Sequence, residues 1–312
     1  MASLERIMTS FQLRQSILLL ITAVIWGSAF VAQSIGMDSV GPFTFTTSRT
    51  LLGAIVLLPL VVWRRTALVK TDPQEALRRS SRGYRRALLM GGLSCGLCLF
   101  AGEAFQQFGL VFHTEAGKAG FITSLYIVLV PVMSTFLGRR SNLLMWTSVA
   151  VACAGLWYLC VPPEGISIAL GDFFVFLCAF AFAVHILVIG HFVKTVDAVE
   201  LSVSQFLFAS LLAFIATALF EAPTYQGWIE ALPAILFAGI LSNGVAYTLQ
   251  VVGQRGMNET AASLIMSLES VFSVIAGWLV LGQVLTVREL AGCVVMGCAV
   301  VLAQIPVKSK KR

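Results

Sequence analysis

Two charged residues, Arg49 and Glu269, lie inside long apolar segments and are the first candidates for chemistry in this sequence. Arg49 follows Pro42 by about seven residues, or roughly 10 Å at ~1.5 Å per residue, and Glu269 lies roughly 13 Å from the nearest polar break. A charge in an apolar environment costs at least a few kcal/mol, so it is paired, faces water or serves a function. We expect Arg49 to hold a carboxylate or to tie helices together. We expect Glu269 to meet an amine or to carry a coupling proton.

Two polar stripes accompany these charges, and each has the spacing of one helix face. The first stripe, at i, i+3 and i+4, consists of Glu103, Gln106 and Gln107. Its glutamate either pairs with Arg49 or reaches the outer interface. The second stripe, at i, i+4, i+7 and i+11, consists of Asn243, Tyr247, Gln250 and Gln254. We expect the second stripe to face a polar interior. We expect Glu103 and the Asn243-Tyr247-Gln250 face to converge with Arg49 and Glu269 on one cavity.

Aromatic and polar residues of other apolar segments are candidates for the wall of that cavity. An organic solute would pack against aromatic rings, and the candidates are Trp26, Tyr126, His185 and Trp278. At an offset of 156 residues, Gln205 is the counterpart of Arg49 and should lie opposite it. Packing inside a helix bundle is the competing interpretation of these aromatic residues.

An intramembrane serine hydrolase is the rival interpretation of the same segments. Gly92-Leu93-Ser94-Cys95-Gly96 fits the G-x-S-x-G pattern, and His185 could accept the proton of Ser94. That pattern normally needs a strand–turn–helix elbow, whereas small residues are common where membrane helices pack. A channel is a third interpretation, but no ring of like polar residues recurs across the segments. We therefore expect no catalytic residues.

The composition of the chain indicates that lipid is its main solvent. Of the 312 residues, 58% are apolar and only 12% are charged, and the mean hydropathy is +0.90. Soluble domains are near 45–50% apolar and about a quarter charged. These values exclude a soluble globule, a disordered chain and a basic nucleic-acid binder. Seven cysteines scattered through apolar segments form neither a disulfide framework nor a metal site, so no metal or cofactor is expected.

Apolar segments separated by short polar breaks predict an all-α membrane protein with ten transmembrane helices. Only the polar stretch 64–86 is long enough to predict a substantial loop. An odd number of spans in each half would insert the halves in opposite orientations, as two inverted five-helix repeats at 16–161 and 171–306. The predicted spans are 16–36, 42–63, 87–108, 117–137, 143–161, 171–193, 200–220, 231–252, 260–282 and 287–306.

The distribution of basic residues predicts that both termini are cytoplasmic. Positively charged residues are retained on the cytoplasmic side of membrane proteins. With the N-terminus inside, 18 of the 21 Lys and Arg residues fall on inner segments, and only Lys118 and Arg288 fall at outer ends. The predicted location is the inner or plasma membrane.

Several short motifs are distributed over both halves of the chain. They are Ala23-x-x-Trp26-Gly27-Ser28-x-Phe30, Pro42 with Arg49, the run Thr114–Tyr126 with Pro131, Gly171-Asp172, and Ser267-Leu268-Glu269 running on to Leu281-Gly282. Together these motifs resemble the EamA branch of the drug/metabolite transporter superfamily over nearly the whole chain. The family usually has proline after the glutamate of span 9, where Ser270 follows Glu269, and glutamate where Arg139 and Gln283 stand.

The resemblance implies a secondary transporter, not an enzyme, that works by alternating access. Its substrate would be a small organic metabolite such as an amino acid, and the resemblance implies export. The expected partners are this solute and the lipid bilayer, with proton coupling through Glu269. The sequence selects no particular solute and no oligomeric state.

Overall fold

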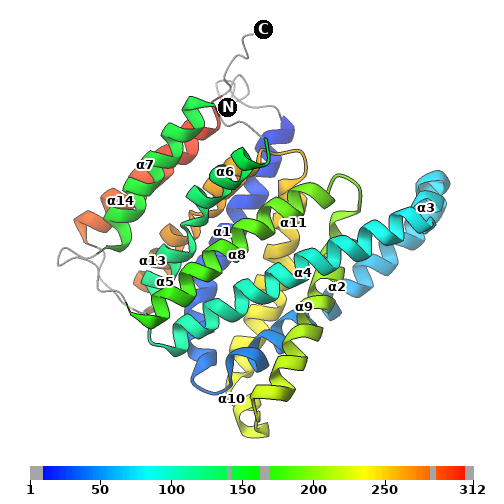
Figure 1. The fold of residues 1–312 in the computed structure, drawn as a ribbon, viewed down its shortest axis with the longest axis horizontal. Helices are drawn as coiled ribbons and strands as arrows, with labels where there is room; N and C mark the ends of the chain where they lie inside the picture. Colours follow the sequence, from blue (N-terminus) through cyan, green and yellow to red (C-terminus); the bar gives the residue numbers. More distant parts are fainter. Residues whose placement is uncertain (1–9, 115, 139–141, 162–168, 282–285, 306–312) are drawn as a thin grey trace.

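The computed structural model describes residues 10–114, 116–138, 142–161, 169–281 and 286–305, and this part of the chain is entirely helical (Figure 1). One helical segment, η1, has the wider π-helical hydrogen bonding, and the others are α-helices. The helices are α1 (Ser10–Met37), α2 (Pro42–Thr71), α3 (Pro73–Ser80), α4 (Arg82–Val111), α5 (Ala116–Thr123), α6 (Tyr126–Phe136), α7 (Leu143–Cys160), α8 (Leu170–Phe192), α9 (Ala198–Phe220), α10 (Tyr225–Leu236), η1 (Phe237–Tyr247), α11 (Thr248–Gln254), α12 (Glu259–Met266), α13 (Glu269–Leu281) and α14 (Val287–Ala303).

Within the described ranges, nine helical segments are long and apolar enough to cross a membrane, and they coincide with the first nine predicted spans. The fourth span is divided between α5 and α6, the eighth among α10, η1 and α11, and the ninth between α12 and α13. The tenth predicted span corresponds to α14, which has 17 residues and packs lengthwise against α7. Its crossing of the membrane stays a prediction.

The helices begin where the sequence supplies groups that cap them. The free backbone N–H groups of a first helical turn are satisfied by Asp, Asn, Ser or Thr side chains at the N-cap. Asp197 caps α9, Asn258 caps α12 and Thr224 caps α10 in this way. Thr286 and Glu289 form a reciprocal capping box at α14. These short-range contacts set the points at which the spans begin.

The prediction of a loop over 64–86 was wrong, because this polar stretch is almost wholly helical. Arg, Lys, Glu and Ala favour helices whether or not the helix is in lipid. The chain therefore continues helical until Asp72, whose extended backbone (φ −145°) precedes Pro73, the first residue of α3. Ser81 then accepts a hydrogen bond from the Tyr84 N–H and begins α4. The two long helices α2 and α4 thus form a hairpin that ends in α3 (Figure 1).

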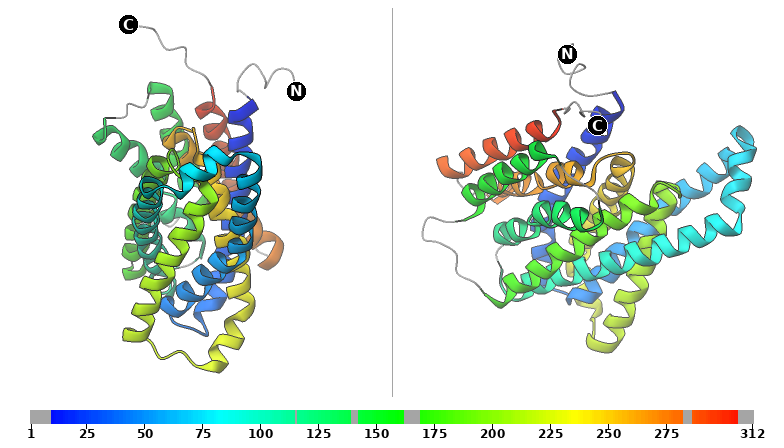
Figure 2. Two further views of the ribbon diagram at one scale, coloured as in Figure 1. Left: turned by 90° about the vertical axis from the view of Figure 1, so that its right-hand side faces the viewer. Right: turned by 45° about the horizontal axis from the view of Figure 1, so that its top comes forward.

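Helices from the two halves pack against one another throughout the bundle. Helix α4 packs on α8 and α9, α2 on α9, and α1 on α13 and the eighth span. The largest buried apolar cluster contains Leu99, Phe206 and Leu264, from α4, α9 and α12. The first described turn of α1 and the last turn of α14 lie at the same end of the bundle (Figure 2). The halves therefore form one interlocked body with its core between them.

The outward faces of these helices carry large, exposed apolar side chains, whose contact with water would be unfavourable. Examples are Phe214 at 58% exposure and Phe180 at 49%. Soluble proteins rarely expose contiguous apolar surface of this extent, whereas lipid tails solvate it. The packing surface faces inward and the lipid surface outward, so polar residues inside the bundle must pair with one another.

Candidate functional site

A small cavity lies between the two halves and is lined by residues from both. Six of the eleven predicted site and wall residues line it: Trp26, Arg49, Tyr126, Tyr247, Gln250 and Glu269. Seven further residues complete the lining: Phe30, Gln33, Gln106, Thr123, Phe182, Ile186 and Ser242. The lining combines aromatic and apolar residues with polar ones, which suits a solute with both kinds of surface.

Arg49 is held in place by buried partners from two other helices. Its Nε lies 3.2 Å from Oε2 of Glu103 on α4, and its Nη1 donates to Oε1 of Gln33 on α1 at 2.9 Å. Gln107 donates to the same Gln33 oxygen, and Asn243 of η1 donates to Oε1 of Glu103 at 3.2 Å. The exposed fractions of Arg49 and Glu103 are 2% and 0%. Glu103 therefore pairs inside the bundle and does not reach an interface.

Some polar atoms at this cavity have no protein partner. Within the described residues, Nη2 of Arg49, Nε1 of Trp26 and Oε1 of Gln250 are buried and form no hydrogen bond. All three residues line the cavity. Leaving a buried donor or acceptor unpaired costs about 1–3 kcal/mol, so such groups need an explanation. A bound solute or water in the cavity would satisfy them.

Glu269 is surrounded by hydroxyl groups. Tyr126 donates to its Oε1 at 3.0 Å and Ser124 donates to the same atom at 3.4 Å. Ser124 also bonds Ser270 at 2.6 Å. Among the residues with described side chains, no basic group forms an ion pair with Glu269, which is 4% exposed. A carboxyl group in this setting can hold a proton or receive a cationic group from a solute.

Glu269 owes its position to a helix break that has a counterpart in the other half. The fourth span turns at Ser124-Leu125, and the ninth turns 143 residues later at Ser267-Leu268. At each turn the backbone tightens to i→i−3 bonds, from Leu125 N to Ile122 O at 3.1 Å and from Leu268 N to Ile265 O at 3.2 Å. Irregular backbone inside a membrane is tolerated where it is buried in protein or lines a cavity. Tyr126 and Glu269, two residues after the equivalent serines, meet at the cavity.

The π-helix η1 changes the predicted polar stripe of span 8. The stripe assumed α-helical spacing from Asn243 to Gln254, but the chain is π-helical up to Tyr247. As a result Asn243 bonds Glu103 behind Arg49, whereas Tyr247 and Gln250 line the cavity. Gln254 instead donates to the Ile186 carbonyl at 3.5 Å. All four residues of the stripe are buried inside the bundle, and two of them line the cavity.

His185 and Gln205 lie behind the cavity wall. Their side chains bond each other at 2.9 Å (His185 Nε2 to Gln205 Oε1), and both are fully buried. The His185 ring lies 6.0 Å from that of Tyr247, whose ring in turn lies 4.6 Å from that of Trp26 at an interplanar angle of 58°. Trp278 is 50% exposed, so its prediction as a cavity wall was wrong.

The residues of the hydrolase pattern do not form a catalytic pair. Ser94 lies in the middle of the continuous helix α4, where no strand–turn–helix elbow exists. A Cβ at Gly96 would lie 2.8 Å from the Gln205 carbonyl oxygen, so the small residues of the pattern bring α4 close to α9. His185 is bonded to Gln205, and no hydrogen bond joins it to Ser94 in the described part of the chain.

Gln33 is the main site residue that the sequence interpretation missed. It is 4% exposed and accepts hydrogen bonds from both Arg49 and Gln107. A glutamine deep in an otherwise apolar span was the signal that could have identified it.

The EamA-like transporter family model matches the chain twice, over residues 13–161 and 169–304. The chain belongs to the EamA-like transporter family. An uncharacterized transporter of Archaeoglobus fulgidus is 28% identical over 297 residues, covering 93% of this chain and 85% of the relative. The uncharacterized transporter YoaV of Bacillus subtilis is 22% identical over 284 residues, covering 89% and 92%. This EamA-like chain is therefore a multi-pass membrane transporter and not an enzyme.

A solved crystal structure supports the fold of this EamA-like protein. The two structures share a TM-score of 0.70 at 18% sequence identity, over 92% of this chain and 96% of the other. At this identity the likeness shows the fold alone. Two matches to one family model agree with an internal repeat, one copy in each half of the chain.

Proposed function

We propose that this protein is a secondary transporter that moves a small organic solute by alternating access between two inverted halves. The observation that carries the proposal is the cavity, which both halves line and whose lining includes unpaired polar atoms of Arg49, Trp26 and Gln250. No ATP-binding motif occurs in the sequence, so the driving force is a solute or proton gradient. The proposed repeats are residues 16–161 and 171–306.

Equivalent close packing in the two halves supports the inverted arrangement. A Cβ at Gly109 would lie 3.2 Å from the Gly171 carbonyl oxygen, and a Cβ at Gly253 would lie 3.3 Å from that of Gln15. Gly109 and Gly253 are 144 residues apart, and Gln15 and Gly171 are 156 apart. Each contact thus joins the third span of one half to the first span of the other. An exchange of equivalent partners is what a pseudo-two-fold axis between the halves produces, and an odd number of spans in each half would place this axis in the membrane plane.

The polar lining supports a solute that carries a carboxylate or another anion. Arg49 keeps one guanidinium nitrogen unpaired while Glu103 and Gln33 fix the rest of the side chain. A guanidinium held in this way recognises a planar anion well, because little side-chain freedom is lost on binding. Glu269 would receive an amine of the solute or carry the coupling proton. Trp26 and Tyr247 would pack against its apolar part.

The sidedness of the protein follows from its basic residues. The arginines at the α2–α3–α4 end would be cytoplasmic, together with both termini. Of the segments used for this assignment, Arg139, Arg140 and the C-terminal lysines lie outside the described residues. We expect single cysteines at exposed positions such as Arg82 to be labelled by an impermeant thiol reagent only after permeabilisation. Labelling in intact cells would overturn this topology.

Transport by purified protein in proteoliposomes tests the function. A mixed panel of amino acids and related metabolites is offered with and without a pH gradient, and both uptake and efflux are measured. We expect net movement of at least one zwitterionic or anionic solute. Accumulation of a reaction product without net movement would favour a hydrolase instead.

Two variants test the site within the same assay. Glu269→Gln should abolish transport driven by the pH gradient, and Arg49→Ala should abolish binding of the anionic group. Glu230→Gln is the matched control, because Glu230 is an exposed carboxylate on α10 that accepts a hydrogen bond from Gln226 of the same helix. Wild-type rates in both site variants would place the site elsewhere. Disappearance of the protein from the membrane would show that these residues are structural.

A further inference from the structure

Helices α2 and α9, one from each half, pack lengthwise and are joined at both ends by polar contacts. They are equivalent helices at an offset of 156 residues, which relates Arg49 to Gln205. We name the two sets of contacts the arginine clamp (Arg64, Arg65, Arg79, Tyr84, Asp197 and Glu200) and the Glu221 clamp (Phe43, Thr44 and Glu221). Arg49, which lines the cavity, lies on α2 between the two sets of contacts.

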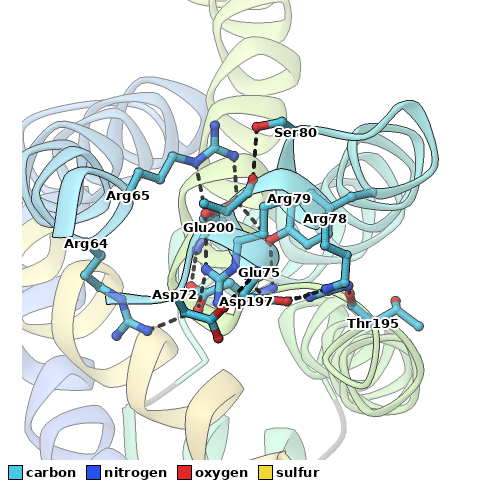
Figure 3. A network of polar contacts seen from close by, with 12 residues as sticks. Arg64, Arg65, Asp72, Glu75, Arg78, Arg79, Ser80, Thr195, Asp197 and Glu200 are labelled. Atoms are coloured by element: carbon cyan, nitrogen blue, oxygen red, sulfur yellow. Dashed lines mark hydrogen bonds and ion pairs between the residues drawn. The ribbon is translucent and has the colours of Figure 1, made fainter. Parts of the chain in front are cut away.

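The arginine clamp attaches the end of α2 to the beginning of α9 (Figure 3). Arg65 donates to both carboxylate oxygens of Glu200, from Nε at 2.9 Å and from Nη2 at 2.7 Å. Arg64 donates from Nη2 to Oδ2 of Asp197 at 3.1 Å. The two arginines are about half exposed, whereas Asp197 and Glu200 are 5% and 4% exposed. Bidentate contacts of this kind combine energy with fixed geometry.

The α3–α4 segment completes the arginine clamp. Arg79 Nη1 lies 3.1 Å from Oδ2 of Asp197 and 3.4 Å from Oε1 of Glu200. The Tyr84 hydroxyl donates to Oε2 of Glu200 at 2.9 Å and accepts a bond from the Asp197 N–H at 3.0 Å. Two carboxylates thus bind three arginines, all of them from the first half of the chain.

The Glu221 clamp lies at the opposite end of the same helix pair. Glu221 directly follows α9, and its carboxylate accepts hydrogen bonds from the N–H groups of Phe43 at 2.8 Å and Thr44 at 2.7 Å. The Thr44 hydroxyl donates to it as well, at 2.6 Å. These N–H groups belong to the first turn of α2, where a negative charge is favoured by the helix dipole. A single, partly exposed carboxylate makes this clamp.

The two clamps occupy equivalent positions in the two halves. At the offset of 156 residues, Glu221 is equivalent to Arg65, and Glu200 is equivalent to Thr44. In each half a residue near the end of one helix therefore binds the first turn of its counterpart, through the same pair of positions. The positions are equivalent but the chemistry differs, since one clamp is a partly exposed ion-pair network and the other is a helix cap.

We propose that these clamps are the two latches of the transport cycle, so that each opens when the cavity opens to its side. The inference rests on the proposed alternating access between inverted halves. The contacts of both clamps are formed in this structure, so α2 and α9 are held together at both ends. The arginine clamp contains more charge-assisted bonds, so the Glu221 end opens more readily in the absence of solute.

Thiol labelling tests the latches without any knowledge of the solute. The reporter is Ser242→Cys, at a cavity-lining position, in a background whose seven native cysteines are replaced. An impermeant thiol reagent is applied to inside-out and right-side-out vesicles. Glu200→Gln should raise labelling from the arginine-clamp side, and Glu221→Gln from the opposite side, each about tenfold, a change that one lost charge-assisted bond can produce. Glu230→Gln should change neither rate.

Cross-linking provides the second test and guards against misfolding of a variant. The pairs Arg65→Cys with Glu200→Cys, and Thr44→Cys with Glu221→Cys, are closed by a bifunctional thiol reagent in folded protein. Each cross-link should reduce labelling of the reporter from its own side to background and leave the other side unchanged. Unchanged labelling after both cross-links would overturn the proposal and make α2–α9 a fixed spine. A failure to find a transported solute would not affect this readout.

Discussion

Glu103→Gln is the substitution that most directly tests how Arg49 is held at the cavity. Glu103 is fully buried, with Oε2 at 3.2 Å from Arg49 Nε and Oε1 accepting from Asn243 at 3.2 Å. A neutral amide leaves the Arg49 charge buried with Gln33 as its remaining hydrogen-bond acceptor among the described residues. At an effective dielectric constant of about 20, the lost attraction at this distance is about 5 kcal/mol. Removing one partner of a buried pair costs about 3–5 kcal/mol by measurement in other proteins.

The assay for this variant is thermal unfolding of purified protein in detergent. At about 2–4 °C per kcal/mol for chains of 150–250 residues, we expect Tm to fall by roughly 10 °C. The double variant Arg49→Met with Glu103→Met should recover most of this loss, because it removes both charges and leaves apolar side chains of similar volume. Glu230→Gln is the control and should leave Tm unchanged.

Transport by the same variants separates support from solute contact. The double variant should be stable but should not move the solute identified in proteoliposomes, because it lacks the guanidinium. A decrease in Tm of less than about 2 °C for Glu103→Gln would refute the reasoning that Glu103 neutralises Arg49. Wild-type transport by the double variant would refute the role of Arg49 at the cavity.

Two further predictions concern packing and pH. Gly27→Ala should destabilise the protein by about 1–3 kcal/mol, because the new Cβ would lie 2.7 Å from Cβ of Phe272 on α13. Gly83→Ala is the control and should not destabilise the protein, because no atom lies within 4 Å of the new Cβ. Thermal unfolding of both variants makes the comparison. Hydrogen bonds from Arg78 and Arg79 lower the pKa of Glu75 from 4.5 to about 2, so its stabilising contribution is complete above pH 4.5 and is lost as the pH falls toward 2. The difference in Tm between wild type and Glu75→Gln should therefore stay constant above pH 4.5 and shrink below it, and a difference that grows on acidification would contradict this assignment.

The sequence by itself was enough to show that this protein lies mainly in lipid and to give the approximate limits of its helices. A membrane span is recognised from the hydropathy of about 20 consecutive residues. A capping side chain such as that of Asp197 or Asn258 binds backbone N–H groups two or three residues further along the chain. Both effects are local, so they can be read without knowledge of the fold. The one large error, the loop expected over 64–86, came from treating polarity as a sign of irregular backbone.

The tertiary structure decided which of the polar residues meet. Arg49, Glu103 and Asn243 come from three helices and lie up to 194 residues apart in sequence, yet they form one network. Their meeting depends on the rotation of each helix about its axis, and a π-helical stretch between residues 237 and 247 alters that rotation. Hydrophobic periodicity cannot supply this information inside a membrane, because lipid-facing and packing surfaces are both apolar.

The same reason applies to the clamps at the ends of α2 and α9. The basic residues of the first half were visible in the sequence, but their partners Asp197 and Glu200 lie more than 100 residues away, at the start of a helix in the other half. A surplus of arginine predicts only the side of the membrane on which it lies. Which carboxylates it binds is set by the packing of the two helices, because a side chain can pair only with what the helix register brings within its reach.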